Sequence, residues 1–88
     1  MDLKKIRIKR IDGEFEDSAF EYKGLANFIF RKTQDIGELE FARELYKTGE
    51  VELTKENALI LKTYIKECFG AVVHESLFPI LDKEIDRQ

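Results

Sequence analysis

The chain holds few side chains suited to covalent chemistry, since His74 is its only histidine and Cys68 its only cysteine. A thiol and an imidazole can form a nucleophile–base couple when they come within hydrogen-bonding distance. These two residues lie six positions apart on helical segments that Gly70 separates, so only a sharp turn could bring them together. Glu75 and Ser76 complete the residue types of a hydrolytic triad, but sequence neighbours on a helix do not face one another. We therefore expect a structural histidine, a buried thiol and no enzyme activity.

Metal and nucleotide sites are not predicted by any motif. One histidine, one cysteine and scattered carboxylates do not give the spacing of a metal site. The five glycines are isolated from one another, so the sequence contains no glycine-rich phosphate loop. We expect no metal, no cofactor and no small-molecule ligand.

Size and composition are those of one small domain. The chain has 88 residues, a net charge of −3 and an apolar fraction of 43%, which is too high for a disordered chain. A single cysteine excludes an intramolecular disulfide. The N-terminal residues lack the apolar run of about 7–15 residues that a signal peptide needs. Because no apolar run approaches the ~20 residues that span a bilayer, we expect a cytoplasmic protein without membrane contacts.

A β-hairpin is predicted over residues 3–22. Ile6 and Ile8 alternate with lysine and arginine, which is typical of a half-buried strand. Asp12 and Gly13 then form a dipeptide that favours a hairpin turn, and an aromatic-rich return strand follows.

Two registers of this hairpin compete. A two-residue turn at Asp12-Gly13 would pair Ile8 with Asp17, whereas a three-residue loop ending at Glu14 would pair Ile11 with Phe15. Turn chemistry favours the first register and cross-strand chemistry favours the second. We predict the second.

Residues 23–86 predict four helical segments, and the stretch over residues 51–69 contains the clearest of them. Thr54 can cap that helix, and Asp35 can cap the helix before it, which Gly49 ends. The buried stripe of the clearest helix follows helical spacing: Ala58, Leu61, Ile65 and Cys68. Pro79 predicts either a kink in the last helix or a restart near Ser76. The sequence thus predicts a single α+β domain, a hairpin followed by a small bundle of four helical segments.

Surplus apolar residues on two helices suggest an interaction surface. Phe28, Ile29 and Phe30 are consecutive, so Phe30 should point away from the stripe that enters the core. Phe78, next to Leu77, gives the last helix the same surplus. One interpretation is a helix sandwiched between the hairpin and other helices. The other, our leading hypothesis, is a non-enzymatic module that binds a protein partner or a second copy through Phe30 and Phe78.

The first strand supports a second hypothesis, a small regulator that binds nucleic acid through Lys5, Arg7 and Lys9. Residues 1–11 carry five basic residues and one acidic residue, and a basic β-ribbon can follow phosphates. However, residues 12–22 carry five acidic residues. If the strands pair, we expect these charges to neutralise one another across the ladder.

Residues 26–54 carry a pattern that also bears on function. It includes Phe-Ala-Arg-Glu-Leu-Tyr at residues 41–46 and Val-Glu-Leu-Thr at residues 51–54. This segment resembles small uncharacterised proteins of phages and mobile elements, which also begin with a short β-hairpin. The resemblance implies an accessory protein of such an element and assigns no functional residue.

Overall fold

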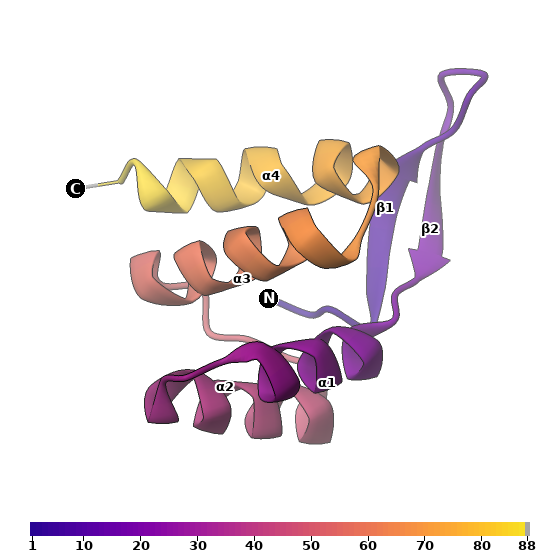
Figure 1. Ribbon diagram of the computed structural model, residues 1–88. Coiled ribbons are helices and arrows are strands. Elements are labelled where there is room, and N and C mark those ends of the chain that lie inside the picture. Colours follow the sequence, from indigo (N-terminus) through magenta and orange to yellow (C-terminus); the bar gives the residue numbers. More distant parts are fainter. Residues whose placement is uncertain (88) are drawn as a thin grey trace.

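A two-stranded antiparallel hairpin and four helices follow one another in the computed structural model, which describes residues 1–87 (Figure 1). The elements are β1 (Lys5–Lys9), β2 (Phe15–Ala19), α1 (Tyr22–Lys32), α2 (Ile36–Thr48), α3 (Lys55–Cys68) and α4 (Ala71–Ile85). This order confirms the predicted α+β class. None of these helices combines the length and the apolar character needed to cross a membrane.

The hairpin takes neither of the two predicted registers. Its loop has three residues, Ile11 to Gly13, and Gly13 has a φ of +88°. The Arg10 N–H donates to the Glu14 carbonyl at 2.7 Å, and the Gly13 N–H donates to the Arg10 carbonyl at 3.0 Å. The observed pairs are Lys5–Ala19, Ile6–Ser18, Arg7–Asp17, Ile8–Glu16 and Lys9–Phe15. A three-residue loop closed by a left-handed glycine is a common hairpin turn, and here it leaves Ile11 exposed at the tip instead of opposite Phe15.

The predicted helix ends are confirmed. The Asp35 carboxylate accepts from the Gly37 N–H at 2.7 Å and so caps α2. The Thr54 hydroxyl accepts from the Asn57 N–H at 3.1 Å and caps α3. Gly49 ends α2 with a φ of +71°. These caps satisfy backbone groups that a helix end leaves free.

One alternative for the last helix is wrong. α4 runs without interruption from Ala71 to Ile85, so no restart occurs near Ser76. Pro79 lies inside this helix on its exposed side. Its missing N–H therefore leaves an unpaired carbonyl where water can reach it.

The helices form two pairs, with α1 packed on α2 and α3 packed on α4 (Figure 1). The N-terminal segment runs between these pairs, where Leu3 is fully buried. The Leu3 N–H donates to the Gly49 carbonyl at 2.8 Å, and the Val51 N–H donates to the Met1 carbonyl at 2.9 Å. This short antiparallel pairing joins the chain start to the α2–α3 connection.

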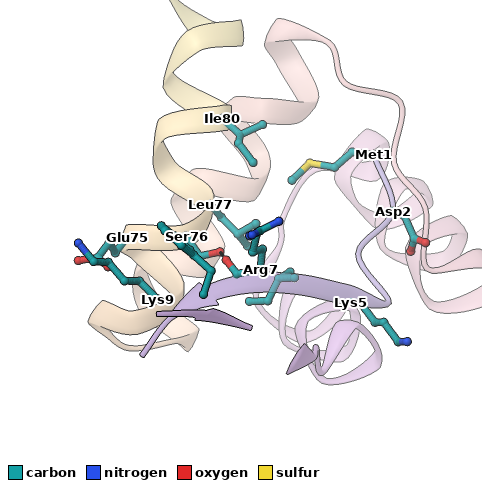
Figure 2. Close-up of a pocket in the computed structure, with 11 residues that line it drawn as sticks. Met1, Asp2, Lys5, Arg7, Lys9, Glu75, Ser76, Leu77 and Ile80 are labelled. Carbon is teal, nitrogen blue, oxygen red and sulfur yellow. Dashed lines mark hydrogen bonds between the residues drawn. The ribbon is translucent and has the colours of Figure 1, made fainter. Parts of the chain in front are cut away.

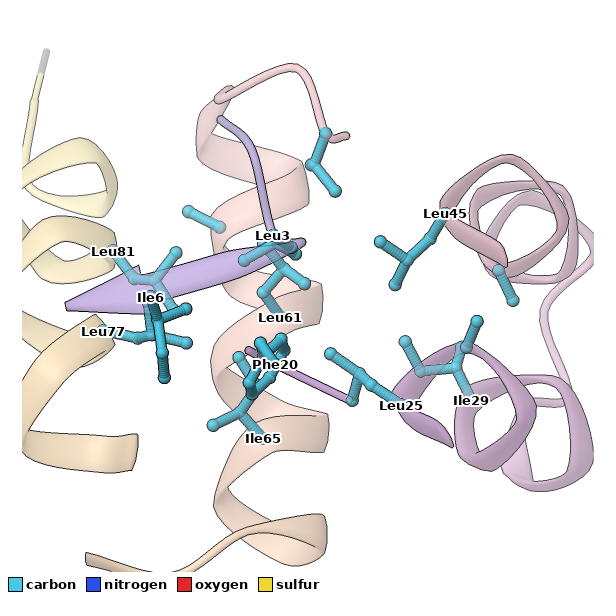
Figure 3. Packing of buried hydrophobic residues seen from close by; sticks show 14 residues of the cluster. Leu3, Ile6, Phe20, Leu25, Ile29, Leu45, Leu61, Ile65, Leu77 and Leu81 are labelled. Atoms are coloured by element: carbon cyan, nitrogen blue, oxygen red, sulfur yellow. The ribbon is translucent and has the colours of Figure 1, made fainter. Parts of the chain in front are cut away.

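A single core joins both helix pairs and the hairpin, and α3 supplies its centre (Figure 3). Its buried members are Leu3, Ile6, Phe20, Leu25, Ala26, Ile29, Ala42, Leu45, Val51, Ala58, Leu61, Ile65, Leu77 and Leu81. Phe20 is the only phenylalanine among them, so most of the aromatic side chains lie at the margin of the core or outside it.

Candidate functional site

A pocket of about 230 Å³ opens between α1 and α2, and we call it the α1–α2 pocket. Its lining residues are Ala26, Asn27, Phe30, Ala42, Arg43 and Tyr46. The two alanines are only 1% exposed and form its floor. Phe30 and Tyr46 are 45% and 46% exposed and form its walls. Small residues at the helix crossing thus leave a hollow between two half-exposed aromatic rings.

Cationic groups lie over both aromatic walls of this pocket. The guanidinium carbon of Arg43 is 5.6 Å from the centre of the Phe30 ring. The ammonium of Lys23 is 5.3 Å from the centre of the Tyr46 ring. Arg43 also pairs with Glu40, since Nη1 and Oε1 are 2.5 Å apart. The pocket therefore combines aromatic side chains with an arginine, the residue types that are enriched at protein interfaces.

Phe30 occupies the position expected of it, since Leu25 and Ile29 on the same helix are buried while Phe30 is half-exposed. Sequence reasoning missed the other residues of the pocket, including Arg43 and Tyr46. The signal was the spacing of four between Ala26 and Phe30 on α1, repeated by Ala42 and Tyr46 on α2. Such pairs place a small residue and an aromatic residue on the same side of a helix.

Phe78 lies elsewhere and is half-buried between α3 and α4. Its ring stacks on His74, with centroids 4.6 Å apart and an interplanar angle of 7°. The Lys62 ammonium lies 5.5 Å from the centre of the Phe78 ring. Phe30 and Phe78 therefore belong to different helix pairs and do not share a pocket.

His74 and Cys68 show no catalytic arrangement within residues 1–87. The Nε2 atom of His74 is 3.2 Å from the Ile65 carbonyl oxygen, and no carboxylate or nucleophile contacts the ring by a hydrogen bond in that range. Burial raises the pKa of the Cys68 thiol above its ordinary value of 9.0, which disfavours the reactive thiolate. In the same part of the chain, no three potential metal ligands gather in one place.

Lys5, Arg7 and Lys9 lie on one face of β1 and are exposed, as strand alternation predicts. Asp17 lies opposite Arg7 in the ladder, but none of the three residues forms an ion pair within the described chain. Arg10 alone pairs within the hairpin, with Asp12 and, at 3.9 Å, with Glu16. This contact holds the pKa of Asp12 below its ordinary value of 3.8.

Comparisons with family models, curated proteins and solved structures found no match. The resemblance to phage and mobile-element proteins, the protein partner and the nucleic-acid contact of β1 all stay predictions.

Proposed function

We propose that this protein is a non-enzymatic interaction module that binds a protein partner through the α1–α2 pocket. An apolar side chain of the partner enters the pocket between Phe30 and Tyr46, and Arg43 pairs with a polar group beside it. Buried aromatic and arginine side chains at the centre of an interface carry much of its binding energy.

One observation carries this proposal: Phe30 and Tyr46 are half-exposed on either side of a floor made by two buried alanines. Folding of residues 1–87 leaves these two aromatic residues only half-buried, although burying an aromatic ring is favourable. A partner that covers both rings gains this apolar area and excludes water from the cation–ring contacts of Arg43 and Lys23.

Affinity capture from an extract of the native host, with and without nuclease, tests the proposal. The wild type, Phe30→Asp and Leu59→Asp serve as baits, and mass spectrometry identifies what each retains. Leu59 is the matched control because it is also 45% exposed and lies on α3, outside the pocket. We expect a protein that survives nuclease treatment with the wild type and Leu59→Asp, and a loss of at least about tenfold with Phe30→Asp.

The same variants distinguish a separate partner from a second copy. Analytical ultracentrifugation of the purified wild type would show a dimer that Phe30→Asp dissociates if the pocket binds another copy. Retention that is equal for Phe30→Asp and wild type, with both variants folded by circular dichroism, would contradict the proposal. Retention that disappears with nuclease would contradict it as well.

A further inference from the structure

A second pocket, which we call the β1–α4 groove, lies where α4 crosses the free edge of β1 (Figure 2). Its volume is about 530 Å³. The Ser76 hydroxyl donates to the Arg7 carbonyl oxygen and fixes α4 against the strand. This groove shares no lining residue with the α1–α2 pocket, so an inference about it is independent of the function proposed above.

The basic side of the groove is formed by Lys5, Arg7 and Lys9. Because these cations form no ion pair within residues 1–87, a ligand anion would not have to displace an existing partner. The Arg7 guanidinium lies over the Phe15 ring, with its central carbon 5.3 Å from the ring centre. An arginine oriented by an aromatic ring loses less freedom when it binds a carboxylate.

The apolar side of the groove includes Phe15 and Ile80, which are 56% and 46% exposed. Behind them lie Ile6 and Leu77, which are 6% and 2% exposed and belong to the core. The groove therefore presents apolar side chains on β2 and α4 with a row of cations beside them. An occupant that satisfies both must combine apolar side chains with negative charge.

Acidic residues in and beside the groove favour an acidic peptide over a nucleic acid as its occupant. Asp2 and Glu75 also line it, and Asp17 lies opposite Arg7 on the exposed face of the hairpin. A nucleic acid carries a charge on every phosphate and would meet these carboxylates. A peptide can place single carboxylates at the cations and apolar side chains elsewhere, which matches the mixed lining.

We propose that the β1–α4 groove binds an acidic, apolar segment of a protein partner. Its carboxylates pair with Arg7 and the neighbouring lysines, and an apolar side chain packs between Phe15 and Ile80. The protein would then have two separate binding surfaces, one between α1 and α2 and one between the hairpin and α4.

Nuclear magnetic resonance titration of the ¹⁵N-labelled full chain tests this inference. The probe is a twelve-residue peptide of glutamate, leucine and phenylalanine. The comparison probes are the same peptide with every glutamate replaced by glutamine and a twelve-nucleotide single-stranded DNA. We expect the acidic peptide to shift the amide signals of residues 5–9 and 75–80, and the glutamine peptide to bind at least about tenfold more weakly.

Reversing the charge of Arg7 tests whether the acidic peptide binds in the β1–α4 groove. Arg7→Glu should weaken binding of the acidic peptide at least about tenfold. Arg31→Glu is the matched control, because Arg31 is an exposed arginine on α1, outside the groove. The inference is overturned if the acidic peptide leaves the groove signals unchanged, if Arg7→Glu binds it as the wild type does, or if the DNA binds there more tightly than the peptide.

Discussion

The phenol of Tyr64 on α3 donates a hydrogen bond of 2.7 Å to the Glu38 carboxylate on α2. The Thr33 hydroxyl donates to the same carboxylate oxygen at 2.9 Å. Glu38 lies three residues after the Asp35 cap, which is the spacing of a capping box, but the Asp35 N–H donates instead to the Thr33 hydroxyl oxygen at 3.0 Å. Glu38 thus accepts from Thr33 and from a distant helix, and it links the two helix pairs.

This contact makes stability depend on pH in the alkaline range. Burial and the hydrogen bond to Glu38 raise the pKa of Tyr64 above its ordinary value of 10.0. A raised folded-state pKa means that the contribution to stability is complete below pH 10 and is lost as pH rises through the folded-state pKa. We expect Tyr64→Phe to lower the free energy of unfolding by about 0.5–1.5 kcal/mol at pH 7. Urea unfolding at pH 7 and pH 11 measures this difference, which should shrink at pH 11; an equal difference at both values would contradict it.

Gly49 needs the conformational freedom of glycine. Its φ is +71°, and a Cβ there would lie 2.7 Å from Cγ of Lys4. Gly49→Ala should therefore cost about 1–3 kcal/mol of unfolding free energy. Gly24→Ala is the control, because a Cβ there meets its nearest neighbour, in Glu21, at 3.7 Å. Since Gly24 lies inside α1, this change should stabilise the protein by about 0.5–1 kcal/mol. Thermal unfolding should therefore show a lower melting temperature for Gly49→Ala and a higher one for Gly24→Ala.

An engineered disulfide tests the register of the hairpin. Arg7 and Asp17 face each other as a pair without mutual backbone hydrogen bonds, so their Cα atoms lie about 4.5 Å apart. In a Cys68→Ala background, Arg7→Cys with Asp17→Cys should form a disulfide on oxidation and raise the melting temperature.

The control pairs for this disulfide come from the two registers that the sequence predicted. Arg7→Cys with Ser18→Cys, or with Ala19→Cys, should stay reduced or form a disulfide that lowers the melting temperature. A stabilising disulfide in either control pair, and none with Asp17→Cys, would show that the hairpin adopts another register.

Features that depend on a few neighbouring residues were predictable from the sequence. The caps at Asp35 and Thr54 and the helix end at Gly49 involve backbone groups within four residues of each of these positions. The burial of Leu61 and Ile65 follows from helical spacing alone.

Features that depend on distant segments were not predictable. The N-terminal segment pairs with the α2–α3 connection, which lies far from it in the sequence. Leu3 bonds to Gly49, and Val51 bonds to Met1, which is 50 positions away. The hairpin register is set by the place of Gly13, which has a left-handed conformation, in the loop. A left-handed glycine occurs in hairpin loops of several lengths, so the Asp-Gly dipeptide alone did not fix the register. The α1–α2 pocket depends on the relative position of two helices, so Phe30 could be singled out on its own helix, whereas its pairing with Tyr46 across a pocket could not.

Photo-crosslinking from within the α1–α2 pocket tests the central claim most directly. Asn27 lines the pocket and is exposed, so a photo-reactive phenylalanine analogue at this position would contact whatever occupies it. The same analogue at Leu59 is the control. In cells of the native host, we predict a discrete protein adduct from position 27, none from position 59, and loss of the adduct when Phe30→Asp is added. Adducts that are equal at both positions, or that persist with Phe30→Asp, would contradict the proposed interface.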